Sequence, residues 1–491
     1  MTRRVPPWLL VPALVCGGVV ASCGAGMLFC GAVAALGDGR AVAALAVPGA
    51  GAVALGAGVV AFAGTRLVRS LTVHALTGFA AVTLAWVVAA AAAAVPLLAS
   101  GALSDPLDAY FEAMSGFTTM GATVIDDLEA QPEGILMWRC LTQWLGGVGI
   151  VVLVVAVAPV SGPALQRAFY AEMSGLTTER LTPRIVGTAK IIAGIYVVLT
   201  AAGALAYLAA GLGLFDAVAH AFSTLATGGF STRDASIGAF GSLGVELACM
   251  AGMTLGAINF AFYWLTITGR SLWPQLGEIR AFLGILAGAS AAVTASLLLA
   301  GDADGFGEAL RQGAFSAVSV TSSTGFTTAD FDGWNSFARL ALFGLMFVGG
   351  CAGSTAGGMK VIRVMLLGKI ARQEVDRQLQ PSGVQVLRAG RRAFPERVRG
   401  AVLGFALVYV LVFAAGALAL AAIGLDLSTA VSAAASSINI VGPGLGDVGA
   451  VESYAELPQA ALVVSALLML IGRLELFTVV ALLAAAFRLR R

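Results

Sequence analysis

Residues 436–446 read SSINIVGPGLG, a run of glycine and proline between two strongly apolar stretches of the chain. Three other segments interrupt the chain in the same way, each after a similar short apolar stretch. They are GFTTMGATV at 116–124, TLATGGFST at 224–232 and TSSTGFTTA at 321–329. Glycine and proline break regular helices, so the fold depends on what four such breaks do together.

The composition predicts a polytopic membrane protein. Of the 491 residues, 59% are hydrophobic and 11% are charged, and the mean hydropathy is +0.91. A soluble protein is not so apolar. Runs long enough to cross about 30 Å of hydrocarbon, roughly 20 residues each, are expected at 8–35, 41–63, 71–99, 136–159, 186–212, 241–268, 281–300, 337–369, 398–423 and 458–487. The sequence therefore predicts about ten transmembrane helices.

The charges predict the orientation of these spans. With the N-terminus in the cytoplasm, the inner segments carry most of the arginines and lysines, and the opposite segments carry most of the acids. This distribution satisfies the positive-inside rule and places the C-terminus in the cytoplasm as well. An acidic outer face concentrates cations at its mouth, although the ordinary exclusion of basic residues from the outside explains part of the asymmetry. Whether the first 22 residues are a cleaved leader stays open.

Each glycine break follows a segment of about a dozen residues that is too short to span the membrane, so we expect a re-entrant half-helix. A full span follows each break, and a unit of span, half-helix, extended return and span occurs four times. Such internal repeats imply pseudo-symmetry. The expected parts are a two-span hairpin at 1–70, repeats at 71–163, 164–270, 271–371 and 398–491, and a basic cytosolic linker at 372–397.

Extended backbone at membrane depth predicts a cation path. Its carbonyl groups are tolerated there only where they line water or coordinate something. Glycine permits the positive φ that aims successive carbonyls in one direction, and rings of carbonyl oxygens replace the hydration shell of K⁺ in selectivity filters. Half-helices that point their C-terminal ends at the centre also favour a cation there.

Several motifs closely resemble the Trk/Ktr/HKT superfamily of potassium transporters. They include FEAMSGFTTMGATV, WRCLTQWLGGVGIVVL, GGCAGSTAGGMKVIR and NIVGPGLG, and the segment AEMSGLTTERLTPRIVGTAK at 171–190 is similar to the TrkH branch. The resemblance covers the chain from about residue 71 to its end. It implies K⁺ uptake through a single-chain pore in the bacterial inner membrane. It also implies a homodimer controlled by a cytosolic, nucleotide-binding ring of the TrkA kind.

The same resemblance implies the positions of the ion filter. Its glycines map to four positions, each with the residue before it: Met120 and Gly121, Thr227 and Gly228, Thr324 and Gly325, and Val441 and Gly442. In plant relatives a serine at the first glycine accompanies Na⁺ preference, so glycine at 121 favours K⁺. Met120 stands where the family usually has threonine, and Thr227 where it usually has an aliphatic residue.

A second anomaly interrupts the span expected at 337–369. Residues 349–360 read GGCAGSTAGGMK, and each glycine inside a helix costs about 1 kcal/mol relative to alanine. The resemblance implies an intramembrane gating loop, whereas tight helix crossing is the alternative. The expected gate residues are Gly349, Gly350, Gly353, Ser354, Thr355, Gly357, Gly358 and Lys360. Arg473 matches a family arginine thought to project below the filter, with an ion pair to a neighbouring helix as the alternative.

The sequence favours a transporter over an enzyme. It contains no H-E-x-x-H motif, no P-loop and no soluble segment large enough to bind ATP. Two other functions stay open: the pore subunit of a potassium pump linked to a P-type ATPase, and a non-conducting receptor or scaffold. The basic linker suits either lipid headgroups or a docked partner. We expect no cofactor beyond the transported K⁺, and no nucleic-acid partner.

Overall fold

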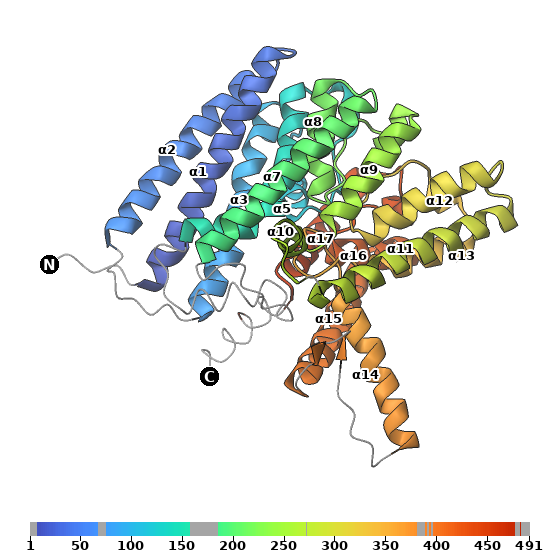
Figure 1. Cartoon of the computed structure of the whole chain (residues 1–491). Helices are drawn as coiled ribbons and strands as arrows, with labels where there is room; N and C mark the ends of the chain where they lie inside the picture. Colours follow the sequence, from blue (N-terminus) through green and yellow to red (C-terminus); the bar gives the residue numbers. More distant parts are fainter. Residues whose placement is uncertain are drawn as a thin grey trace.

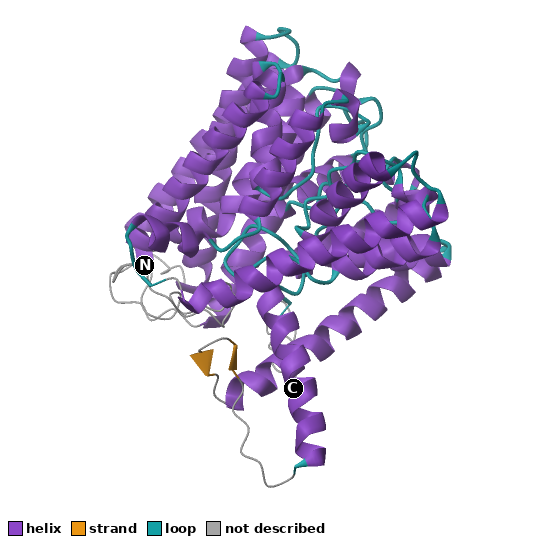
Figure 2. Ribbon diagram, turned by 45° about the vertical axis from the view of Figure 1, so that its right-hand side comes forward, coloured by secondary structure: helices purple, strands orange, loops and turns teal. Residues whose placement is uncertain are grey.

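The computed structural model describes residues 7–66, 75–157, 185–271, 273–380, 388–389, 392–393, 396–476 and 482. Within these ranges the protein is helical apart from one short antiparallel pair, β1 (Arg388–Ala389) and β2 (Arg392–Ala393) (Figure 2). The predicted all-helical fold is therefore confirmed. Most of the TrkH-like segment at 171–190, much of the basic linker and the arginines at 488–491 lie outside the described residues.

Six described helices are long and apolar enough to cross a membrane. They are α1 (Pro7–Leu36), α2 (Val42–Arg66), α3 (Ala75–Ala99), α7 (Ile185–Ala209), α11 (Trp273–Ala300) and α15 (Glu396–Ile423). A bent pair of helices makes a seventh span if it is counted as one. The remaining expected spans correspond to α5 (Glu133–Val157), to the interrupted pair α13 (Ser336–Met346) and α14 (Val361–Leu379), and to α17 (Gln459–Arg473).

Small residues let α1 and α2 approach closely. A side chain at Gly56 would crowd the Gly17 carbonyl and the backbone of Ala21, and one at Gly24 would crowd Gly49 and the backbone of the next turn. Between lipid-exposed helices such close contact replaces the hydrophobic drive that water supplies elsewhere. The pair runs along one side of the molecule together with α3, whereas α14 and the neighbouring end of α15 extend away from the helical body (Figure 1).

Four short helices lead toward the centre. They are α4 (Pro106–Thr118), α8 (Leu214–Leu225), α12 (Phe306–Thr321) and α16 (Leu427–Asn439), and they confirm the four expected half-helices. Asp105 and Asp426 cap α4 and α16 by accepting hydrogen bonds from first-turn amides, as N-terminal aspartates commonly do. The C-terminal half of each helix is buried among the other elements.

The span expected at 241–268 is broken, which the sequence analysis did not predict. It consists of α9 (Leu243–Gly256) and α10 (Phe260–Ile267), which meet at an angle of 88°. Asn259 caps α10 by accepting a hydrogen bond from the Ala261 amide. The break leaves backbone groups near residues 256–260 without helical partners, and these groups bind the loop described below.

Candidate functional site

Four extended segments follow the half-helices and share one backbone conformation. We call them the glycine segments: residues 119–122, 227–230, 323–326 and 440–443. Each starts with a left-handed residue, namely Thr119, Thr227, Ser323 or Ile440, with φ of 62°, 53°, 54° and 59°. Two residues later each has a glycine of positive φ, namely Gly121, Gly229, Gly325 or Gly442, with φ of 86°, 83°, 84° and 99°.

This pattern corrects one expected position. In the second segment the residue equivalent to Gly121 is Gly229, so the expected equivalence of Gly228 was one residue out of register. The hydrogen bonds agree, because the amides of Met120, Gly228, Thr324 and Val441 all bond to a serine carbonyl five residues earlier at 2.9–3.0 Å. Gly228 therefore corresponds to Met120, Thr324 and Val441, and Thr227 corresponds to Thr119.

The glycine segments close a ring. A Cβ atom added at Gly121 would overlap the carbonyl oxygen of Gly228, and one at Gly229 would overlap that of Thr324. One at Gly325 would overlap the Val441 oxygen, and one at Gly442 would come within 2.7 Å of the Met120 oxygen. Each segment thus lies against a carbonyl of the next, and the fourth returns to the first. Since only glycine leaves room for these oxygens and adopts this φ without strain, four glycines are required.

A large cavity opens on one side of this ring. Its volume is about 740 Å³, and Gly121, Gly229, Gly325 and Gly442 all line it. We call it the acidic cavity because its wall carries Asp126, Asp127, Asp234, Asp332, Asp447, Glu452 and Glu456 against two arginines, Arg139 and Arg233. Nearby, a hydrogen bond to Asp234, partial burial and the repulsion between the two carboxylates raise the pKa of Glu129. Such a surface attracts cations.

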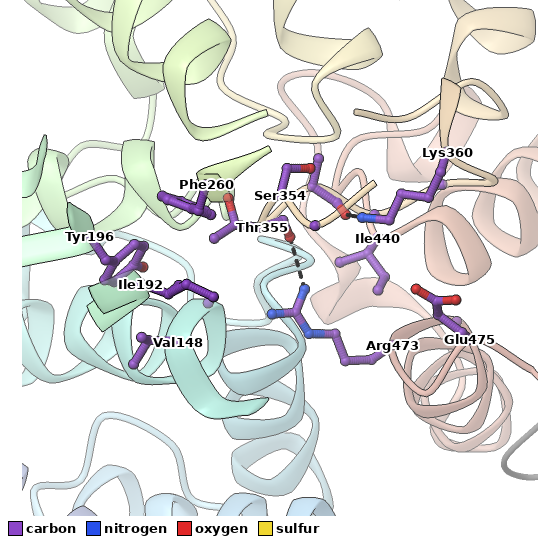
Figure 3. A pocket seen from close by; sticks show the side chains of 16 residues that line it. Val148, Ile192, Tyr196, Phe260, Ser354, Thr355, Lys360, Ile440, Arg473 and Glu475 are labelled. Atoms are coloured by element: carbon purple, nitrogen blue, oxygen red, sulfur yellow. Dashed lines mark hydrogen bonds between the residues drawn. The ribbon is translucent and has the colours of Figure 1, made fainter. Parts of the chain in front are cut away.

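A smaller cavity of about 110 Å³ lies beside the interrupted region between α13 and α14 and is lined by Ile440, the first residue of the fourth glycine segment. We call it the arginine cavity because Arg473 lines it, together with Lys360, Glu475 and residues 353–358. In Figure 3, the guanidinium group of Arg473 points at Thr355 and is hydrogen-bonded to it, and Tyr196 and Phe260 lie on the side opposite to Lys360 and Glu475. Glu475 forms an ion pair of 2.6 Å with Arg363.

Arg473 donates hydrogen bonds to neutral oxygens of three different elements. They are the Thr119 hydroxyl at 3.2 Å, the Thr355 carbonyl at 3.0 Å and the Gly146 carbonyl at 2.7 Å. Its side chain is buried. The guanidinium group therefore joins the first glycine segment to α5 and to the loop between α13 and α14.

We call that loop, residues 347–360, the interrupting loop. It contacts the other three glycine segments at or just before their first residues. The Thr227 hydroxyl donates to that of Thr355 at 3.3 Å, and the Gly357 amide donates to the Ser323 hydroxyl at 2.5 Å. The Gly358 amide donates to the Asn439 carbonyl, just before Ile440, at 3.0 Å. Together with the hydrogen bond from Arg473 to Thr119, these contacts place a polar group of the loop or of Arg473 at the beginning of every glycine segment.

The broken helix and a buried carboxylate hold the interrupting loop in place. The Cys351 amide donates to the Ala257 carbonyl at 2.8 Å, and the Phe260 amide donates to the Gly353 carbonyl at 3.1 Å. On α11, Glu278 Oε1 accepts from the amides of Ala352 at 2.7 Å and Ile362 at 3.2 Å.

The expected gate residues are all in or beside this loop. Gly349, Gly353 and Gly358 have positive φ, and a Cβ atom at Gly349, Gly350 or Gly357 would overlap neighbouring backbone or side-chain atoms. Ser354 bonds to the Cys351 carbonyl at 2.6 Å, and Lys360 bonds to the Ala356 carbonyl. The glycines therefore serve a compact loop rather than the crossing of two continuous helices.

Sequence reasoning missed the residues behind the ring. Arg139 and Glu112 form an ion pair of 2.7 Å in which both side chains are at most 2% exposed, and Gln143 contacts the second glycine segment. The motif WRCLTQWLGG contains two of them. A buried charge in an apolar span is a signal in itself, because it requires a partner or a polar environment.

The chain resembles known transport proteins along most of its length. Residues 53–286 and 305–488 match the family profile described as "TrkH: Cation transport protein". The Trk system potassium uptake protein TrkH of Halomonas elongata is 43% identical over 414 residues, which are 84% of this chain and 85% of that protein. The protein of the same name from Escherichia coli K12 is 39% identical over 415 residues, with the same two shares.

A solved structure agrees with the fold. The crystal structure of the potassium transporter TrkH from Vibrio parahaemolyticus matches with a TM-score of 0.86 at 36% identity, over 97% of this chain and 98% of that one. The expectation of a multi-pass transport protein rather than an enzyme is thereby confirmed. This chain belongs to the TrkH family of cation transport proteins.

Proposed function

We propose that the chain takes up K⁺ across the bacterial inner membrane through the ring of glycine segments. The observation that carries this proposal is the closed ring itself, in which four glycines each lie against a carbonyl of the next segment. The relatives named above are potassium uptake proteins. The ring lies between the acidic cavity, which faces outward, and the arginine cavity, which faces the cytoplasm.

The ring acts by replacing water around the ion. The carbonyls of Met120, Gly228, Thr324 and Val441 supply oxygen ligands of the kind that coordinate K⁺ in filters. The acidic cavity raises the local cation concentration at the entrance, and the C-terminal ends of four half-helices add partial negative charge toward the centre. Glycine at 121 keeps the first quarter of the ring free of a side chain.

The interrupting loop and Arg473 form the gate of this pathway. The loop contacts the beginning of the second, third and fourth glycine segments and Arg473 contacts that of the first, so protein occupies the path below the ring. A positive charge at this point also opposes a cation electrostatically. Displacing the loop then opens the path.

The further assignments follow the family resemblance. The chain works as a homodimer, and a cytosolic, nucleotide-binding ring of the TrkA kind acts on the basic linker at 372–397. Both termini lie in the cytoplasm. The four pore repeats have the boundaries 71–163, 164–270, 271–371 and 398–491, and the hairpin at 1–70 precedes them.

Growth at low K⁺ tests this function. Expressed in bacteria that lack potassium uptake, the chain should restore growth in low-K⁺ medium, and Na⁺ should not replace K⁺. Gly229→Ala should weaken this rescue, and the matched control Gly301→Ala should keep it, because Gly301 also has positive φ but has nothing near its Cβ position. A membrane-inserted, well-expressed protein that fails to restore growth contradicts the proposal. Rescue that requires an added ATPase subunit favours the pump alternative.

A further inference from the structure

The ring is not symmetric in how its carbonyls are held. Gln143 on α5 donates a hydrogen bond from Nε2 to the Gly228 carbonyl at 2.6 Å, and its Oε1 accepts one from the Phe230 amide at 3.1 Å. Its side chain is fully buried. Within the described residues, no hydrogen bond to the ring carbonyls of Met120, Thr324 or Val441 is found. One of the four ring oxygens is therefore tethered to a side chain.

The support behind Gln143 is rigid. Arg139 lies one helical turn earlier on the same face of α5, and it bonds Glu112 at 2.7 Å and the Ser231 carbonyl at 3.1 Å. Its guanidinium also stacks on the Phe230 ring at 4.2 Å. Arg139 thus joins α5 to α4 and to the second glycine segment through buried charged and polar groups, beside the amide of Gln143 that bonds Gly228.

We propose that Gln143 is a specificity-determining residue, which fixes the Gly228 carbonyl so that the ring favours K⁺ over Na⁺. This inference rests on the proposed function. A carbonyl oxygen has two acceptor sites, so Gln143 occupies one and leaves the other for the ion. The tether keeps this oxygen from closing onto a smaller ion, and the partial positive charge of the Gln143 N–H group weakens the field that the oxygen exerts on the ion. Cavity size and the field strength of the ligands govern K⁺/Na⁺ selection in carbonyl filters. Through both of them, the hydrogen bond from Gln143 favours K⁺ over Na⁺.

The test compares the uptake of ⁸⁶Rb⁺ and ²²Na⁺ by proteoliposomes that contain the purified full chain. Gln143→Met removes both hydrogen bonds at similar volume. Gln143→Glu keeps the acceptor for the Phe230 amide but loses the donor to Gly228. The matched control is Thr200→Val on α7, which removes a partly buried hydrogen bond of 3.0 Å that Trp144, the neighbour of Gln143 on α5, donates to the Thr200 hydroxyl and not to a ring carbonyl. A ratio of two initial rates does not depend on the number of folded copies.

Both Gln143 variants should lower the Rb⁺/Na⁺ ratio about tenfold, the effect of one hydrogen bond of typical net strength, whereas Thr200→Val should keep the wild-type ratio. An unchanged ratio in transporting Gln143 variants overturns the inference. Variants that transport neither ion beside an active Thr200→Val also overturn it, because Gln143 is then required for folding or conduction rather than selection. Absence of uptake both by the wild-type chain and by a folded chain shortened at 349–358, in which the proposed gate is open, refutes the proposed function instead.

Discussion

Arg473 offers the sharpest test of the gate. Its Nη1 atom lies 3.2 Å from the Thr119 hydroxyl, and the next residue along the chain is about 3.8 Å further, so an ion at the Met120 carbonyl is roughly 7 Å away. At an effective dielectric constant of about 20, a unit charge at that distance costs a cation about 2 kcal/mol. This energy corresponds to about 30-fold in rate, so Arg473→Met should raise flux by up to that factor.

A second variant separates charge from hydrogen bonding. Arg473→Lys keeps the charge but loses the planar fork of donors. If the charge is the barrier, the lysine variant should transport like the wild type. The assay is initial ⁸⁶Rb⁺ uptake by proteoliposomes at matched protein density, with gel filtration to confirm that each variant is folded. A folded methionine variant with unchanged or lower flux would refute the electrostatic part of the gate. A lysine variant as fast as a faster methionine variant would refute it too.

Three further outcomes are expected. Gly229→Ala should lower ⁸⁶Rb⁺ uptake at least about tenfold, since left-handed alanine costs about 1 kcal/mol and its Cβ overlaps the Thr324 carbonyl, while Gly301→Ala should keep the wild-type rate; equal rates would contradict the corrected register. Arg139→Met should destabilise the protein by about 3–5 kcal/mol because it strands a buried carboxylate, against about 1 kcal/mol or less for Arg339→Met, whose partner Asp332 is partly exposed, as measured by denaturant unfolding in detergent. Shortening residues 349–358 should raise uptake and reduce its dependence on a cytosolic partner, and a folded deletion with lower uptake would remove the loop from the gate.

Much of this architecture could be predicted from the sequence because its signals are local. A dozen apolar residues followed by glycine is too short to span and too flexible to continue as helix, and this pattern located all four half-helices. The glycine-rich stretch at 349–360 predicted the interruption between α13 and α14 for the same reason. The length of an apolar run and the glycine or proline that ends it lie within a few residues of each other. Both can therefore be read directly from the sequence.

The errors arose where distant contacts decide the structure. A single glycine, Gly256, precedes the break at residues 257–259, and the groups freed by the break form hydrogen bonds with a loop some 90 residues further along the chain. Two adjacent glycines made the second segment ambiguous, although aligning GGFSTRD at 228–234 with TGFTTAD at 324–330 pairs Gly229 with Gly325. The hydrogen-bond partner of Gln143 is a carbonyl 85 residues away. The periodicity of apolar residues along a helix does not predict a contact at that separation.

Under the proposed function, the ring of glycine segments binds the transported ion. The most direct measurement is anomalous diffraction from crystals of this chain grown in Rb⁺ or Tl⁺. An anomalous peak is expected between the carbonyls of Met120, Gly228, Thr324 and Val441, and it should weaken when K⁺ is added and persist when Na⁺ is added. Ordered crystals in which the ring holds no such peak, or in which the ion lies elsewhere in the protein, would contradict it.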